Sequence, residues 1–519
     1  MCLALLLLLA KPARAAQACS ELATLTIPGA TITRAELVSA GTFTPPAGKP
    51  IPDLPGFCRV AGISKPSSDS NIQFEVWMPS SGWNGKLRGI GNGGFAGSIS
   101  YDQLGASVAH GYAAAASDTG HQGEATDGSW ALGHPQRITD FGYRAIHETT
   151  VDAKIVTRAF YGDNPRRSYF SSCSNGGRQA LQEAQRYPAD YDGIIAGAPA
   201  NYWTHLLASA AWDAQVLSGD KASYISADKL QAIETAALAA CDELDGVKDH
   251  VIENPTRCHY DVSTLLCKGP ETDSCLTATQ VVALKKLYSG PHTSDAKEIF
   301  PGFAPGGEAE PGGWGLWITG PAPEHGLLYA FGTQFFKNMV FNDPNWDYRA
   351  FNIERDTKAA DEKFAGILNA TNPDLRAFNA RGGKLIIYHG WSDAAIAPRN
   401  TIDYYDTVTA KLGLNETRRF VRLFMVPGMQ HCAGGSGANS FGQFNADIAD
   451  PRRDMNTALE RWVEQGIAPD QIIAAKRKSD FDSKSEVIRT HPLCAWPLEA
   501  RYSGSGSPDD AANFTCGKP

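Results

Sequence analysis

Residues 169–178, Tyr-Phe-Ser-Ser-Cys-Ser-Asn-Gly-Gly-Arg, constrain the fold more than any other stretch of this chain. A short run suited to a β-strand ends in a turn of small residues, and a helix-forming run, residues 179–186, follows at once. This is the pattern of a nucleophile elbow, a strained strand-to-helix corner that presents a serine, so Ser174 is the candidate nucleophile. Ser172 stands where the usual motif has glycine, but it is small enough for the corner, and Gly176 keeps the second glycine.

Strands and helices alternate on both sides of this elbow. Helical periodicity is found in residues 139–160 and 455–464. Apolar runs bounded by turn residues predict strands at 57–62, 73–79, 86–90, 111–117, 168–172, 192–197, 383–390 and 420–426. This alternation indicates an α/β fold with a mostly parallel sheet flanked by helices, and the elbow makes it an α/β-hydrolase fold.

The alternation stops between residues 201 and 373, where helical patches, cysteines and loops take its place. Two of the patches, residues 227–238 and 277–287, have clear helix-forming composition. We therefore expect a catalytic domain built from residues 17–200 and 374–519, with residues 201–373 inserted as a lid domain.

The N-terminus predicts export of the chain. Leu3 to Ala10 is an apolar run, and Ala13-Arg14-Ala15 fits a small-x-small cleavage site, so residues 1–16 are expected to be a signal peptide. A buried N-terminal helix and a weak lipoprotein box at residues 16–19 are alternatives. No basic residue precedes the apolar run, so the natural start and the cleavage site stay open. The run is too short to span a membrane, and we expect a secreted or periplasmic protein.

Charge and cysteine content agree with this interpretation. The net charge of −9 over 519 residues argues against a nucleic-acid binder, which would usually show a basic face. Of the 11 cysteines, Cys2 would leave with the signal peptide, and the remaining even number predicts five disulfides in an oxidising compartment. Free buried thiols are the alternative, and the spacing alone does not fix the pairing.

A serine hydroxyl needs a base to take its proton and an acid to orient that base. In α/β-hydrolases the three residues occur in the order serine, acid, histidine, on loops that follow strands. Asp393 follows the predicted strand 383–390, and His431 follows the predicted strand 420–426. Ser174, Asp393 and His431 are therefore the candidate catalytic triad.

The oxyanion formed during acyl transfer needs backbone N–H donors. One donor is expected at Asn175, directly after the nucleophile. The other is expected from the glycine-rich loop 91–97, at Gly93 or Gly94, where the missing side chains let the backbone approach the substrate. A plain glycine turn and a dinucleotide loop are the alternatives, but no acidic residue is well placed for the second of these.

Cys173 precedes the candidate nucleophile directly, and Cys432 follows the candidate histidine directly. This Cys-Ser, Asp, His-Cys arrangement resembles the tannase and feruloyl esterase family, which includes the hydrolase of mono(2-hydroxyethyl) terephthalate. The resemblance extends over essentially the whole mature chain. It implies five disulfides: Cys19–Cys58, Cys173–Cys432, Cys241–Cys258, Cys267–Cys275 and Cys494–Cys516.

The resemblance also implies a structural Ca²⁺ in the lid. Asp242, Asp245 and Asp249 surround a glycine turn and can offer carboxylate oxygens to one hard cation, with carbonyls filling the other positions. The ligands implied are these three carboxylates and the carbonyls of Val247 and Val251. The alternative is a solvated acidic turn. No organic cofactor is expected.

The resemblance implies that the lid shapes the pocket for an aromatic acyl group. Trp317, Phe335, Phe336, His389 and Ile396 are the expected pocket residues, and the lid side chains Trp314 and Phe331 could also stack on such a group. For each lid aromatic the alternative is a place in the core of the lid.

The resemblance implies a secreted serine carboxylesterase that acts on esters of aromatic acids through an acyl-enzyme, most similar to feruloyl esterases. Tannase and terephthalate-monoester hydrolase activities are alternatives. Asn175 and Ile396 stand where the terephthalate enzyme has Glu and Phe, and no lid arginine is matched, which argues against that monoester. A serine peptidase and a non-catalytic binding protein on the same fold are the remaining hypotheses. The oligomeric state cannot be predicted from the sequence.

Overall fold

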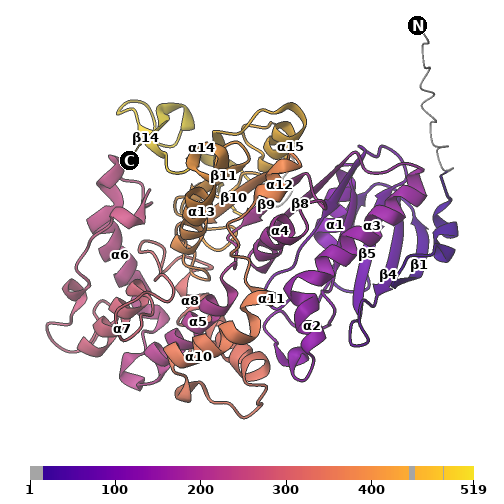
Figure 1. Cartoon of the computed structure of the whole chain (residues 1–519). Coiled ribbons are helices and arrows are strands. Elements are labelled where there is room, and N and C mark those ends of the chain that lie inside the picture. The colour runs from indigo at the N-terminus through magenta and orange to yellow at the C-terminus, as the bar shows by residue number, and fades with distance from the viewer. Residues whose placement is uncertain (1–15, 444–449, 483, 519) are drawn as a thin grey trace, which may run out of the picture.

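The computed structural model describes residues 16–443, 450–482 and 484–518, so all but the last residue of the expected signal peptide lies outside the described part (Figure 1). The core is a nine-stranded sheet. Its strands lie in the order β1 (Ala30–Val38), β4 (Phe57–Ser64), β5 (Ile72–Pro79), β7 (Ala113–Ser117), β6 (Lys86–Gly89), β8 (Arg167–Cys173), β9 (Gly193–Gly197), β10 (Lys384–Gly390) and β11 (Val421–Val426). From β7 to β11 neighbouring strands are parallel, whereas β1, β4 and β5 are joined to each other and to β7 in antiparallel fashion.

All eight strands expected from the apolar runs are present, within a few residues of their expected bounds. The sequence did not predict β1, an edge strand in which no residue is buried and whose alternation is interrupted by a register shift between Ile32 and Arg34. Three two-stranded sheets lie outside the core sheet: β2 (Gly41–Phe43) with β3 (Ile51–Leu54), β12 (Gln471–Arg477) with β13 (Val487–Cys494), and β14 (Glu499–Tyr502) with β15 (Phe514–Gly517).

Helices cover both faces of the sheet, as its buried strands require. Ile194 and Leu385 contribute to the hydrophobic core on one face, and Ile195 and Ile386 contribute to the core on the other. The first face is covered by α3 (Ala145–Tyr161), α4 (Asn175–Arg186) and α13 (Arg399–Leu412). The second is covered by α1 (Tyr101–Ala109) and α15 (Met455–Gln465). Shorter helices are α2 (Pro135–Thr139), α12 (Arg376–Ala380) and α14 (Leu414–Thr417).

Residues 201–373, here called the insert, connect β9 to β10, and no sheet strand is assigned to their described residues. In Figure 1 its pink and orange helices lie together beside the lower end of the sheet. They are α5 (Trp203–Ser218), α6 (Leu230–Cys241), α7 (Ala278–Ser289), α8 (Trp314–Trp317), α9 (Leu327–Gln334), α10 (Ile353–Ala360) and α11 (Gly366–Leu368). The two expected helical patches correspond to α6 and α7. Phe335 and Phe336 lie in the aromatic core of the insert.

Five disulfides link the chain, and they are the five expected pairs: Cys19–Cys58, Cys173–Cys432, Cys241–Cys258, Cys267–Cys275 and Cys494–Cys516. Within the described ranges, no helix has the length and apolar character needed to cross a bilayer.

Candidate active site

Ser174 occupies the corner between β8 and α4. Its backbone has φ 66° and ψ −128°, a combination that a non-glycine residue adopts only where the surroundings enforce it. The close packing of the corner explains the glycine that follows, because a Cβ on Gly176 would lie 1.9 Å from the Ser172 oxygen. The corner is thus the nucleophile elbow that the sequence predicts.

The three candidate catalytic side chains form one hydrogen-bonded chain. Ser174 Oγ lies 2.8 Å from His431 Nε2, and His431 Nδ1 lies 2.8 Å from Asp393 Oδ2. A carboxylate accepts hydrogen bonds, so Nδ1 carries the proton and Nε2 is free to accept the hydroxyl of Ser174. This tautomer is the one that lets histidine act as general base.

A second histidine, His389 near the end of β10, also contacts Asp393 and holds its carboxylate in place. His389 is fully buried, with Nε2 at 3.1 Å from Asp393 Oδ2 and Nδ1 at 2.7 Å from Thr401 Oγ1. Burial alone would raise the pKa of the Asp393 carboxyl. The charges and hydrogen bonds of His431 and His389 outweigh burial and hold that pKa below its ordinary value, so Asp393 remains ionised.

The Cys173–Cys432 disulfide joins the nucleophile and base loops directly. Cys173 is the last residue of β8, and Cys432 adopts a left-handed backbone with φ 66°. Because the bonded residues are the immediate neighbours of Ser174 and His431, the bond limits how far the two catalytic side chains can move apart.

The two expected oxyanion donors meet beside Ser174. Asn175 is the first residue of α4, where backbone N–H groups point away from the helix, and Asn175 and Gly94 both line the cavity next to Ser174. Gly94 has φ +56°, and a Cβ there would lie 2.4 Å from the Ala125 oxygen, so glycine is required. Gly93 does not line this cavity, which leaves Gly94 as the better of the two candidates.

The cavity beside Ser174 has a volume of about 40 Å³. Its lining is almost wholly apolar: Ala200, Trp203, Leu206, Leu207, Trp317, Leu328, Phe331, Ala395 and Ile396 surround Gly94, Ser174, Asn175 and His431. The Trp317 ring meets the His431 ring edge-on, with centroids 4.9 Å apart. In this conformation Trp317, a residue of the insert, therefore packs against the triad histidine.

The expected pocket residues divide into two groups. Trp317 and Ile396 line the cavity, whereas His389, Phe335 and Phe336 do not. His389 lies behind Asp393, and the two phenylalanines are fully buried in the insert core, so these three expectations are corrected. Sequence patterns did not indicate the contribution of α5, which supplies Trp203, Leu206 and Leu207. Trp203, six residues after the buried strand β9, is the signal that could have indicated it.

The five residues expected to bind Ca²⁺ lie in one loop after α6, inside the ring closed by Cys241–Cys258. Backbone N–H groups of the loop donate to its carboxylates: Val247 to Asp245 (3.0 Å), Val251 to Asp249 (3.2 Å) and Asp249 to Asp242 (3.2 Å). The loop is rich in the oxygen ligands that Ca²⁺ prefers.

The charge balance of this loop bears on the calcium prediction. Burial, together with the nearby carboxylates of Glu253 and Asp249, raises the pKa of Asp245 to about 6. Asp249 is partly compensated by Arg489, whose Nη1 lies 2.7 Å away. Among the described residues, no three His, Cys, Asp or Glu side chains converge closely enough to form a metal centre. Calcium binding by this loop therefore stays a prediction.

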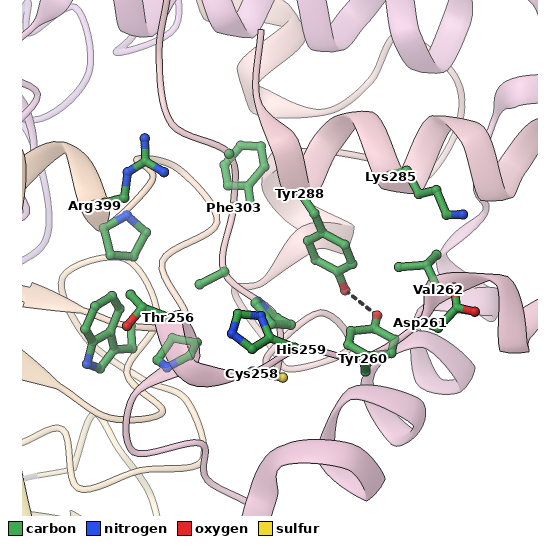
Figure 2. A pocket seen from close by; sticks show the side chains of 16 residues that line it. Thr256, Cys258, His259, Tyr260, Asp261, Val262, Lys285, Tyr288, Phe303 and Arg399 are labelled. Carbon is green, nitrogen blue, oxygen red and sulfur yellow. Dashed lines mark hydrogen bonds between the residues drawn. The ribbon is translucent and has the colours of Figure 1, made fainter. Parts of the chain in front are cut away.

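A much larger cavity, of about 660 Å³, lies between the Cys241–Cys258 ring and the start of α13 (Figure 2). Figure 2 shows Tyr260 and Tyr288 on its wall, joined by a hydrogen bond of 3.0 Å, with Lys285 and Arg399 on opposite sides. None of the triad residues lines this cavity, so its size does not make it the ester site.

A serine, an aspartate and a histidine joined in this way, on loops after parallel strands, define a serine hydrolase of the α/β-hydrolase fold. The chain belongs to the tannase and feruloyl esterase family, whose sequence model matches residues 58–517, and it is a carboxylic ester hydrolase.

Individual relatives agree with this assignment. An uncharacterized esterase of Xanthomonas campestris pv. campestris is 44% identical, over 97% of this chain and 92% of that protein. A probable feruloyl esterase B-2 of Aspergillus terreus is 33% identical, over 88% of this chain and 86% of the relative. The crystal structure of feruloyl esterase B from Aspergillus oryzae superposes with a TM-score of 0.89 at 30% identity, covering 96% of this chain and 99% of that one.

Proposed function

We propose that this chain hydrolyses esters of hydroxycinnamic acids, in the manner of a feruloyl esterase, through a covalent acyl-enzyme. The observation that carries the proposal is the apolar, aromatic cavity directly beside Ser174. A planar aromatic acyl group buries its ring favourably against side chains such as Trp203 and Phe331. Relatives named as feruloyl esterases support the same substrate class.

The geometry supports a two-step reaction. Ser174 attacks the ester carbonyl while His431 Nε2 takes its proton and then passes it to the leaving alcohol. Asp393 orients the imidazole and stabilises its charged form. The backbone N–H groups of Asn175 and Gly94 hold the oxyanion of each tetrahedral intermediate. Water activated by His431 then releases the aromatic acid and regenerates the serine.

The cavity lining supports hydroxycinnamate over the two alternative substrates. A terephthalate monoester carries a free carboxylate that calls for an arginine or lysine, and none lines the cavity within the described residues. A gallate ester carries three hydroxyls, which lose their hydrogen bonds to water in an apolar cavity without matching partners. A hydroxycinnamate has fewer polar groups to satisfy, and the lining therefore favours it.

Two further proposals concern the rest of the chain. We infer that the insert acts as a lid on the catalytic domain, because Trp317 covers His431, and that the acidic loop binds a structural Ca²⁺ through the residues named above. Export to the periplasm or the medium is supported by five disulfides, which persist in oxidising compartments.

The substrate proposal is tested with methyl ferulate, methyl gallate and mono(2-hydroxyethyl) terephthalate, compared by kcat/KM under one set of conditions. We expect the highest value for methyl ferulate, with Ser174→Ala inactive on all three. A gallate or terephthalate value above that of ferulate would overturn the substrate class and leave the esterase assignment intact.

A further inference from the structure

The first turn of α4 contains a buried cation without a counter-ion. Arg178 is fully buried, and no carboxylate in the described part of the chain lies within ion-pair distance of it. Burial lowers the pKa of Arg178 to about 9, so the guanidinium is still charged at neutral pH. Burying an unpaired charge costs folding free energy, which indicates that the side chain is held there by another requirement.

The guanidinium of Arg178 makes two hydrogen bonds to a single atom of Asn175. Arg178 Nε and Nη2 donate to Asn175 Oδ1 at 2.8 and 2.6 Å. Its remaining hydrogen bonds go to the backbone oxygens of Gly142, Leu368 and Phe141. The ring of Phe141 lies 4.6 Å from the guanidinium carbon, so the side chain is fixed by packing as well.

The two hydrogen bonds from Arg178 determine the orientation of the Asn175 amide. Arginine has only donors, so the amide atom that it holds must be the oxygen, and the NH₂ group is the other end. Asn175 is 1% exposed, and its Nδ2 has no hydrogen-bond partner within the described residues. A buried N–H donor without a partner is costly, and Asn175 lines the cavity beside Ser174.

Building on the esterase function, we propose that the side-chain amide of Asn175 is a further catalytic donor to the ester group, and that Arg178 is the positioning residue that holds it. The acceptor must lie close to Ser174, because neighbouring Cα atoms are only ~3.8 Å apart and the asparagine side chain is short. The ester oxygens meet this requirement, and the far ring substituents of an aromatic acyl group do not.

The experiment measures kcat/KM on methyl ferulate, methyl cinnamate and p-nitrophenyl acetate for variants at Asn175 and Arg178 and for a matched control. Asn175→Ala keeps the backbone donor and removes the amide, and we expect a loss of about 10-fold or more on all three esters. Asn175→Asp keeps oxygen acceptors for Arg178 but has no N–H, so we expect at least the same loss. This second variant removes the N–H donor while the hydrogen bonds from Arg178 can still form. It therefore tests the donor whether or not the Arg178 variants fold.

Arg178→Lys tests the positioning role, because lysine lacks the planar fork. We expect a loss of about 10-fold or more, and the double variant with Asn175→Ala should be no slower than the slower single variant. Arg186→Lys is the matched control: it lies on the same helix, contacts the Gly366 oxygen at 2.6 Å and stacks on Tyr143, but does not touch Asn175. We expect its kcat/KM within twofold of the unaltered protein.

The proposal would be overturned by Asn175→Ala or Asn175→Asp with unchanged kcat/KM, or by losses that multiply in the double variant. A loss on methyl ferulate alone would move the amide contact to the acyl ring and equally contradict a role at the ester group. Because p-nitrophenyl acetate has no aromatic acyl group, its result stands even if the hydroxycinnamate proposal fails.

Discussion

Replacing both Cys173 and Cys432 by serine separates the stabilising role of their disulfide from its role at the active site. The two bonded cysteines have a sequence separation of 259. Closing a loop of this length lowers the entropy of the unfolded chain, which predicts that the disulfide stabilises the fold by about 5 to 6 kcal/mol. Replacing Cys267 and Cys275 is the control, because that bond has a separation of 8 and the same relation gives about 2.5 kcal/mol.

The two variants should differ in activity as well as in stability. We expect kcat to fall about 10-fold or more in the Cys173/Cys432 variant, because Ser174 and His431 lose the bond that holds their loops together. The control variant should keep its kcat within twofold. Urea unfolding followed by tryptophan fluorescence measures stability, and kcat is measured on methyl ferulate well below the unfolding midpoint. A folded Cys173/Cys432 variant with unchanged kcat would refute the catalytic role of this bond.

Other predictions concern single features of the structure. Trp317→Ala should raise kcat/KM for bulky aromatic esters relative to p-nitrophenyl acetate, since Trp317 covers His431 in a cavity of about 40 Å³; an unchanged ratio would contradict the lid role. His389→Leu should lower kcat about 10-fold with little change in KM, because Asp393 loses a buried partner; unchanged kcat would show that the contact is dispensable. Burial raises the pKa of the Asp152 carboxyl to about 7. Because the unfolded chain ionises this group at lower pH, Asp152 destabilises the fold increasingly as the pH rises from about 4 to above 7. Asp152→Asn should therefore raise the Tm more at pH 8 than at pH 5, and equal shifts would contradict this assignment. Chelation with EDTA should lower the Tm and added Ca²⁺ should restore it, whereas an unchanged Tm would count against the calcium proposal.

Much of the fold and the triad could be predicted from local sequence, because each depends on a short pattern. Buried strands such as β9 and β10 contain continuous apolar runs, and the elbow needs only small residues around Ser174. Asp393 and His431 follow directly after strands, so their order along the chain also fixes their place in space.

The rest of the site depends on contacts between distant segments, which local patterns do not contain. The pocket wall is formed by α5, α8 and α9 of the insert, and nothing in their composition tells which side chains face Ser174 and which face the insert core. Phe335 and Phe331 are similar in sequence context, yet only Phe331 reaches the cavity. Likewise, nothing in the sequence distinguishes His389 from an ordinary residue near the end of a strand, and its contact with Asp393 is seen only in the structure.

Labelling with a fluorophosphonate, read by intact mass and peptide mapping, tests most directly that Ser174 is the nucleophile of this site. We expect one phosphonyl group per chain, located on Ser174, with no labelling and no ester hydrolysis in a folded Ser174→Ala variant. Label on another residue, or ester hydrolysis that survives in Ser174→Ala, would contradict it.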